Sequence, residues 1–324
     1  MTSEAPLLEI NDLTVGLRAS NIAYDIVRNV NLTVNRNEIL AVVGESGCGK
    51  SLTALSILQL QSSPPLFITS GSIMYGGRDL ATLSKREMRT VRGSEIAMIF
   101  QDPMSALDPM FTVGTLLTSA VHAHLSVGKD VAEKMALEAL ADAGIEDPKR
   151  RFNEYPFQMS GGVSQRVMIA LALVNNPKLI IADEPTTALD VTVQAQILDR
   201  LKELKKDRGM SIMLITHNLG VVASVADRMV VMYTGEVVEM GAVSDVFDNP
   251  QHPYTTGLLG AVPRLGGAVS DLTPIVGRVP QPDELPVGCT FADRCSRALA
   301  QCLTVRPTLQ VRGRAEVRCH NPVG

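Results

Sequence analysis

Gly44-Glu45-Ser46-Gly47-Cys48-Gly49-Lys50-Ser51 follows the apolar run Ile39 to Val43, and these residues give the strongest indication of the fold class. It fits the pattern G-x-x-x-x-G-K-[ST], in which a glycine-rich loop joins a buried strand to a helix. The glycines let successive backbone N–H groups turn toward one anion, and the start of the helix adds its positive end. Because strand, loop and helix occur in the required order, we interpret the segment as a phosphate cradle rather than a chance glycine-rich turn.

The residues of this loop have separate expected roles. Lys50 is expected to reach the β and γ phosphates of a nucleotide, and Ser51 to offer its hydroxyl to Mg²⁺. Cys48 is interpreted as a small loop filler and not as a redox centre, since a thiol is notable only when its pKa is lowered. The other nucleotide contacts are expected from the loop and the first helical turn: Gly44, Ser46, Gly47, Cys48, Gly49 and Leu52.

Two carboxylates come at the end of another apolar run. Leu179 to Ala182 predicts a buried strand, and Asp183 and Glu184 follow it directly. At the carboxyl edge of a parallel sheet, Asp183 is suited to hold Mg²⁺ and Glu184 to polarise the attacking water. Two acids at a strand end are often surface caps, but together with a phosphate loop they indicate a P-loop NTPase of unknown kind, with Mg²⁺ at the phosphates.

The remaining pattern is typical of an α/β protein with a largely parallel sheet, because short apolar runs alternate with amphipathic helical stretches. From Val113 to Arg151 the periodicity is helical throughout, which predicts a helical insertion. Beyond about Asn249 prolines recur and four of the five cysteines appear, which marks a domain boundary. The clearest buried strands are Ile39 to Val43, Ile96 to Phe100, Leu179 to Ala182 and Ser211 to Ile215.

Bulk properties exclude several classes of function. The chain has 324 residues, 45% of them hydrophobic, and a net charge of -4, which argues against a protein held to nucleic acid by bulk electrostatics. No apolar stretch approaches the roughly 18 residues needed to cross a bilayer, so membrane association is expected through a partner. The first residues lack the features of a secretory signal, and we expect the chain to stay in the cytosol.

The segment Met159-Ser160-Gly161-Gly162-Val163-Ser164-Gln165-Arg166 narrows the class of NTPase. Ser-Gly-Gly alone is usually an ordinary helix cap. Here it precedes Asp183 in a P-loop protein, and it resembles the signature sequence of the ABC ATPase family. The resemblance implies that Ser160, Gly161 and Gly162 hold the γ phosphate of a nucleotide on the opposing subunit. Val163 replaces the usual Gln, and we expect activity to survive the loss of that polar contact.

Further positions match the same family over about residues 7 to 250. Gln101 resembles the Q-loop glutamine, which senses Mg²⁺ and the attacking water and touches the permease. Ala188-Leu189-Asp190 resembles the D-loop at the dimer interface, and His217 resembles the switch histidine that contacts the γ phosphate. Tyr24 is the nearest aromatic to the expected adenine-stacking loop, although a plain core or surface tyrosine fits this position as well.

The resemblance also implies an architecture. We expect an ABC nucleotide-binding domain over residues 1–249, with a RecA-like P-loop NTPase core, an antiparallel β subdomain and a helical subdomain at about 102–165. The family closes each ATP between the P-loop of one domain and the signature of another. Since the chain has one of each motif, a second nucleotide-binding domain must come from another chain.

The segment His252-Pro253-Tyr254-Thr255-Thr256-Gly257-Leu258-Leu259 resembles the one that follows the ATPase domain in oligopeptide and dipeptide importers. This implies that residues 250–324 are a C-terminal extension of that type, and that the chain is the ATPase of a peptide importer at the cytoplasmic face of the inner membrane. The implied partners are two transmembrane permease subunits, a paralogous second ABC ATPase and, indirectly, an extracytoplasmic solute-binding protein, with no nucleic acid.

Other functions remain open at this point. Relatives of this subfamily carry nickel, glutathione or sugars. A soluble ABC ATPase of DNA repair or translation is a further alternative, although such proteins usually have coiled-coil insertions or two ATPase domains in one chain. A regulatory metal-binding module with a degenerate ATPase is disfavoured because Lys50, Asp183, Glu184 and His217 are intact.

Cys289, Cys295, Cys302 and Cys319 lie within about 30 residues. In a cytosolic protein, four such thiols suggest a metal site more than disulfides. Their spacing lacks C-x-x-C pairs and is a poor match to zinc ribbons, whereas tetrathiolate ligation of an iron-sulfur cluster is chemically reasonable. The family resemblance favours [4Fe-4S], with zinc and unligated core cysteines as alternatives.

Overall fold

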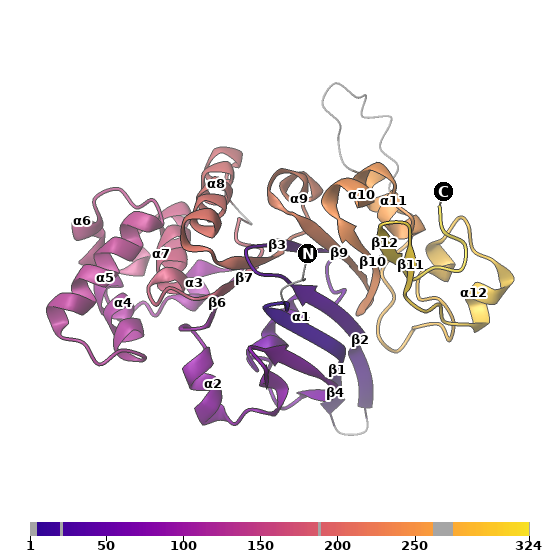
Figure 1. Ribbon diagram of the computed structural model, residues 1–324, viewed down its shortest axis with the longest axis horizontal. Coiled ribbons are helices and arrows are strands. Elements are labelled where there is room, and N and C mark those ends of the chain that lie inside the picture. Colours follow the sequence, from indigo (N-terminus) through magenta and orange to yellow (C-terminus); the bar gives the residue numbers. More distant parts are fainter. Residues whose placement is uncertain (1–4, 20–21, 187–188, 262–274, 324) are drawn as a thin grey trace. The chain divides into compact units, whose positions relative to one another are not determined.

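A computed structural model describes residues 5–19, 22–186, 189–261 and 275–323 (Figure 1). The chain forms two compact units, which we describe separately. The first comprises Met1–Asn35, Ile39–Thr82 and Ile215–Gly324, and the second comprises Arg36–Glu38 and Leu83–Leu214. The segment after residue 249 therefore belongs to the same unit as the glycine-rich loop.

One layer of the first unit is an antiparallel sheet with the strand order β2-β1-β4-β5. Leu8 of β1 pairs with Val34 of β2 on one side and with Tyr75 of β4 on the other. All three side chains are buried, so this face of the sheet packs into the core. The bounds are β1 (Leu8–Ala19), β2 (Ile22–Val34), β4 (Leu66–Tyr75) and β5 (Arg78–Asp79).

The second sheet of this unit runs in the order β11-β12-β10-β9-β3. β3 (Ile39–Val43) and β9 (Arg228–Tyr233) are parallel, and every residue of β3 is buried, as expected where both faces of a strand are covered. The other pairings are antiparallel. The other strands are β10 (Glu236–Ala242), β11 (Gln310–Arg312) and β12 (Ala315–Val317).

The helices of the first unit are the one that follows the glycine-rich loop, short helices between its strands, and the helices of the C-terminal segment. α1 begins at Lys50 and ends at Ile57, because Gln59 has a left-handed φ of 49° that stops the helix. The others are η1 (Leu80–Thr82), α9 (Leu219–Val225), α10 (Val243–Asp248), α11 (Pro253–Gly260), η4 (Ala292–Arg294) and α12 (Ala300–Thr304).

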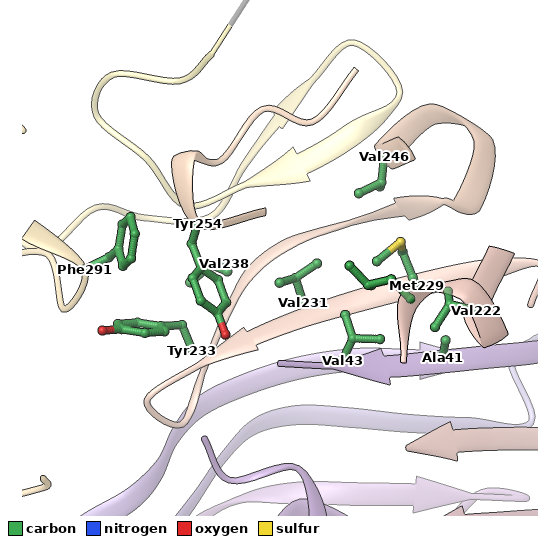
Figure 2. Close-up of a cluster of buried hydrophobic side chains, with 11 residues drawn as sticks. Ala41, Val43, Val222, Met229, Val231, Tyr233, Val238, Val246, Tyr254 and Phe291 are labelled. Atoms are coloured by element: carbon green, nitrogen blue, oxygen red, sulfur yellow. The ribbon is translucent and has the colours of Figure 1, made fainter. Parts of the chain in front are cut away.

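The hydrophobic core of this unit includes aromatic residues of the C-terminal segment (Figure 2). The ring of Tyr254 lies 4.7 Å from that of Tyr233, and the ring of Phe291 lies 5.2 Å from Tyr233, edge-on. These rings contact the same cluster as Val43 of β3 and Val231 of β9. Such aromatic pairs contribute beyond the area they bury, so the C-terminal segment is packed into the core of the first unit.

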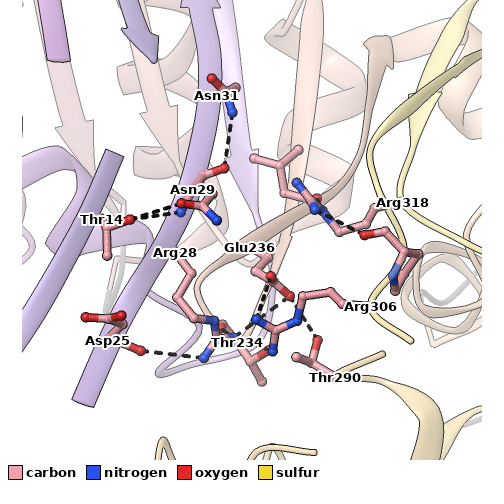
Figure 3. Close-up of polar contacts among 12 residues, drawn as sticks. Thr14, Asp25, Arg28, Asn29, Asn31, Thr234, Glu236, Thr290, Arg306 and Arg318 are labelled. Atoms are coloured by element: carbon pink, nitrogen blue, oxygen red, sulfur yellow. Dashed lines mark hydrogen bonds and ion pairs between the residues drawn. The ribbon is translucent and has the colours of Figure 1, made fainter. Parts of the chain in front are cut away.

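A buried polar cluster joins the same parts of the chain (Figure 3). Glu236 of β10 lies 3.9 Å from Arg28 of β2 and 3.6 Å from Arg306 of the C-terminal segment. The hydroxyl of Thr290 donates to the Glu236 carboxylate at 3.5 Å, and Arg318 donates to the Val237 carbonyl at 2.8 Å. The carboxylate therefore links three chain segments.

The second unit contains strands in the order β8-β7-β6. β6 (Ile96–Ile99) and β7 (Leu179–Asp183) are parallel, with Ile96 opposite Leu179, and β8 spans Ser211–Ile215. The predicted strands are confirmed, with β6 ending one residue before Phe100 and β7 extending to include Asp183. This confirms the α/β class for the parts that the structure describes.

Helices make up the rest of the second unit, and three of them cover the stretch predicted to be a helical insertion. Asp190 caps α8 by accepting a hydrogen bond from the Val193 N–H at 2.9 Å. The helix ends at Gly209, where φ is +61°. The bounds are α2 (Lys85–Val91), α3 (Pro103–Ala106), α4 (Val113–His122), α5 (Lys129–Asp142), α6 (Pro148–Phe152), η2 (Pro156–Gln158), α7 (Gly161–Leu173) and α8 (Val191–Arg208).

Among the described residues, each helix is too short or too polar to span a membrane.

Candidate active site

The glycine-rich loop curls around the ammonium group of Lys50 in the first unit. The Lys50 Nζ donates to the carbonyl oxygens of Gly44 at 2.8 Å and of Glu45 at 2.9 Å. Only 5% of Lys50 is exposed. A Cβ on Gly44 would lie 2.2 Å from the Met232 carbonyl, and Gly49, with φ +93°, turns the chain into α1. The loop therefore turns tightly around Lys50 and leads directly into α1.

The other loop residues differ in exposure. Ser46 and Gly47 are exposed, and Ser51 and Leu52 in the first turn of α1 are half-buried. Cys48 is fully buried, and burial raises the pKa of its thiol. A protonated, buried thiol is a poor nucleophile, which agrees with the interpretation of Cys48 as a loop filler.

His217 lies in the same unit, directly after β8, and its side chain is exposed. The preceding residue, Thr216, donates its N–H to the Val42 carbonyl of β3 at 3.2 Å. Because Val42 comes just before the glycine-rich loop, this bond places His217 beside the start of that loop. Asn218 then caps α9 by accepting from the Gly220 N–H at 3.0 Å.

Two predicted catalytic residues meet in the second unit. The Gln101 Nε2 donates to the Glu184 carboxylate at 3.2 Å, although the two residues lie far apart in sequence. Glu184 has a φ of +46°, a left-handed conformation that is uncommon for a residue other than glycine and often marks functional sites. Asp183, the last residue of β7, is 6% exposed.

The signature segment forms the start of α7. Ser160 is its N-cap, and its hydroxyl donates or accepts no capping hydrogen bond within the described residues of this helix. Gly161 is exposed and Gly162 half-buried, so the first turn of α7 presents backbone N–H groups at the surface. Val163 is half-buried. An exposed helix N-terminus with a serine is suited to an anionic ligand.

The two remaining predicted positions have different outcomes. Tyr24 is half-buried in β2, where it pairs with Leu17 of β1. Of the predicted D-loop, Ala188 lies outside the described residues, while Leu189 is half-buried and Asp190 caps α8. The roles of these residues stay predictions.

The four C-terminal cysteines are free thiols that lie close enough to influence one another. Burial, with smaller contributions from the nearby Cys302, Cys319 and Cys295, raises the pKa of Cys289 to about 11. The Cys302 sulfur accepts the Leu299 N–H at 3.4 Å, and the Cys319 sulfur accepts the Asn321 N–H at 3.3 Å. Within the described ranges, no three or more His, Cys, Asp or Glu side chains form a group that could hold a metal ion.

Sequence reasoning missed two residues that contact the glycine-rich loop. Arg294 forms a two-pronged ion pair with Glu45, and the hydroxyl of Tyr254 accepts the Glu45 N–H at 2.8 Å. Neither residue has a local pattern that indicates this contact. The only available signal was that Tyr254 and Arg294 both lie in segments that resemble importer extensions.

Family comparisons agree with the site. Residues 27–187 match the ABC transporter family, and residues 238–302 match the oligopeptide/dipeptide transporter C-terminal region. The chain is 47% identical over 306 residues to the dipeptide transport ATP-binding protein DppD of Bacillus subtilis, covering 94% of this chain and 91% of that protein. It is 48% identical over 294 residues to the oligopeptide transport ATP-binding protein OppD of the same organism, covering 90% and 82%.

Solved structures show the same fold. The ATP-binding cassette MJ0796 bound to ADP and phosphate superposes with a TM-score of 0.66 at 29% identity, covering 73% of this chain and 98% of that one. CbiO1 of Clostridium perfringens, part of an ABC transporter complex, superposes with a TM-score of 0.65 at 28% identity, covering 76% and 92%. The predicted P-loop NTPase fold is confirmed. The chain therefore belongs to the ABC transporter family of ATP-binding proteins, in the group that has the oligopeptide/dipeptide transporter C-terminal region.

Proposed function

We propose that this chain hydrolyses ATP as a subunit of an ABC importer and thereby drives the uptake of di- or oligopeptides. The names of DppD and OppD, and the match to the oligopeptide/dipeptide C-terminal region, support peptides as the solute. The observation that carries the hydrolytic role is the hydrogen bond from Gln101 to Glu184 at the end of β7. It holds a carboxylate and an amide together, as the positioning of an attacking water requires.

Each residue has a proposed role in the reaction. Lys50 exchanges its hydrogen bonds to loop carbonyls for phosphate oxygens of ATP, assisted by Gly44, Ser46, Gly47, Cys48, Gly49 and Leu52 in the loop and first turn. Ser51, Asp183 and Gln101 would hold Mg²⁺, which neutralises charge on the β and γ phosphates when bound. Glu184 polarises the attacking water, and His217 contacts the γ phosphate.

A second ATPase subunit, a paralogue of this chain, completes the proposed site. Ser160, Gly161 and Gly162 hold the γ phosphate of the ATP on that opposing subunit. ATP binding then stabilises the closed pair of domains, and hydrolysis releases it, which is a population shift between open and closed states. The pair acts on two transmembrane permease subunits at the cytoplasmic face of the inner membrane, and indirectly on an extracytoplasmic solute-binding protein, without nucleic acid.

Replacing Glu184 by Gln tests the hydrolytic role. The variant should bind ATP, accumulate an ATP-stabilised dimer in size-exclusion chromatography, and lose most of its turnover. Glu203→Gln, which removes the same charge from the exposed side of α8, serves as the control and should keep wild-type turnover. If Glu184→Gln turns over ATP as fast as the wild type, the role assigned to Glu184 is wrong.

Purification of the tagged chain from detergent-solubilised membranes, with mass spectrometry of what accompanies it, tests the importer assignment. Two multi-span permeases and a second ABC ATPase are expected, and the associated binding protein identifies the solute as a peptide or as nickel, glutathione or a sugar derivative. Recovery with nucleic acid or ribosomes, and without permeases, would instead favour a soluble ABC ATPase.

We further propose that Cys289, Cys295, Cys302 and Cys319 hold a [4Fe-4S] cluster with a structural role. Four free thiols are a suitable donor set, and backbone N–H groups directed at the sulfurs of Cys302 and Cys319 are typical of ligated thiolates. An iron-sulfur cluster separates its ligating sulfurs more widely than one metal ion does. Anaerobically purified protein should contain about four iron atoms per chain. One zinc per chain, or neither metal, would refute the proposal.

A further inference from the structure

Arg294 of the C-terminal extension forms an ion pair with Glu45, the second residue of the glycine-rich loop. The two Nη atoms of Arg294 lie 2.7 and 3.0 Å from the two carboxylate oxygens of Glu45, which makes the ion pair bidentate. The Arg294 side chain is 6% exposed and that of Glu45 is 31% exposed. An ion pair of this geometry and burial is a fixed contact, unlike an ordinary surface pair.

Arg294 also contacts further residues of its own unit. Its Nε donates to the Val276 carbonyl at 3.0 Å, and its guanidinium lies 5.8 Å from the Tyr233 ring and 6.0 Å from the Phe291 ring. Phe291 is the N-cap of the short helix η4, and Arg294 is the last residue of that helix. The guanidinium therefore reaches Glu45 from a preset position.

The carboxylate, the N–H and the carbonyl of Glu45 each have a partner. Its carboxylate accepts from Arg294, its N–H donates to the Tyr254 hydroxyl at 2.8 Å, and its carbonyl accepts from Lys50 at 2.9 Å. Two of these partners come from the extension. A loop already held in one conformation loses less conformational entropy when a ligand binds.

The charge of Glu45 makes this contact relevant to nucleotide binding. The loop is built to bind a polyphosphate, yet its second residue is an acid. An unpaired carboxylate near the phosphates would repel them, and part of that repulsion would be screened by salt. Pairing with Arg294 cancels the charge where phosphate must approach.

We propose that Arg294 of the C-terminal extension is a positioning residue for ATP, which acts mainly by neutralising Glu45 so that phosphate can approach the loop, and to a smaller extent by holding the loop in its binding conformation. The inference rests on the proposed ATPase function. It gives the extension a part in nucleotide affinity, separate from any role in solute selection or in ligating a cluster.

The test uses the full chain, with affinity for the fluorescent nucleotide mant-ATP and steady-state hydrolysis as readouts. Arg294→Gln should raise the Kd for mant-ATP about tenfold at low salt, and the difference should shrink at high salt. KM should rise with it, while kcat changes less than about threefold. Arg314→Gln removes the same charge from another side chain of the extension, one that is 84% exposed and pairs with Asp245 of α10. The Kd of this variant should stay within about twofold of wild type.

The double variant Glu45→Gln/Arg294→Gln separates charge from folding. It lacks both charges, so it should recover most of the lost affinity, and Glu45→Gln alone should bind mant-ATP nearly as well as the wild type. A double variant as weak as Arg294→Gln, or an Arg294→Gln variant as strong as Arg314→Gln, would overturn the proposal. If the wild type neither binds nor hydrolyses ATP, the proposed function fails instead.

Discussion

Replacing Glu236 by Gln should lower the free energy of unfolding by about 3 kcal/mol. The carboxylate is 4% exposed and faces both Arg28 and Arg306. Without the Glu236 charge, the buried guanidinium of Arg28 keeps its desolvation cost, and its repulsion by Arg306 is no longer offset. Removing one partner of a buried ion pair costs roughly 3–5 kcal/mol. The low end applies because the contacts are 3.9 and 3.6 Å long and the Arg306 side chain is 37% exposed.

Urea denaturation followed by circular dichroism measures this effect. With a slope of about 3 kcal/mol/M, the midpoint should fall by about 1 M. Glu284→Gln is the matched control, since it removes the same charge from an exposed pair with Arg278 and should leave the midpoint unchanged. Equal shifts in the two variants, or a more stable Glu236→Gln protein, would refute the reasoning that a buried charge cluster anchors the extension.

Three further predictions concern packing, pH and thiol chemistry. Gly114→Ala places a Cβ 2.2 Å from the Phe152 ring in the second unit, so it should cost about 1–3 kcal/mol in urea denaturation, whereas Gly128→Ala, which meets no atom within 4 Å, should be neutral. Burial lowers the pKa of His252 to about 3 from 6.5. As pH falls, the imidazole of the unfolded chain is therefore protonated before that of the folded chain, so the free energy of unfolding decreases below pH 6.5. The free energy of unfolding should fall by roughly 1.4 kcal/mol between pH 7.5 and 5.5. In His252→Gln, the urea midpoint should change less with pH over this range. The buried Cys48 thiol, with its raised pKa, should react with N-ethylmaleimide far more slowly in native than in urea-unfolded protein; equal rates would contradict the assigned burial.

The parts of the site that sequence predicted are those encoded by local chemistry. The glycine-rich loop needs particular residues at fixed spacing, so the positions of Lys50 and its loop follow from the residue pattern alone. Gln101 and Glu184 were each predicted at a strand end, and the structure joins them at 3.2 Å. Strands such as Ile39–Val43 were recognisable because both faces are buried and the run is continuously apolar.

The contacts that sequence could not predict are long-range. Nothing near Arg294 indicates that its partner is Glu45, because the pairing depends on how the chain returns to the loop after β10. The end of helix α1 at Ile57 was not predictable either, since the left-handed φ of Gln59 stops the helix. A polar residue with a positive φ is not visible as a helix stop in the same way as glycine.

The prolines after Asn249 suggest an appended domain, but the physical chemistry of the contacts argues for an integral part of the ATPase. Tyr254 and Phe291 fill a core shared with Val43 of β3, and Glu239 of β10 accepts the N–H groups of Gln251 and His252 at 2.7 and 2.9 Å. Removing residues 250–324 would expose aromatic surface and leave buried carboxylates without hydrogen-bond partners, and both changes would destabilise the fold. Phe291 and the nearby Arg294 lie between two of the four clustered cysteines, so any group that those thiols bind would stabilise the same turn that holds the phosphate loop.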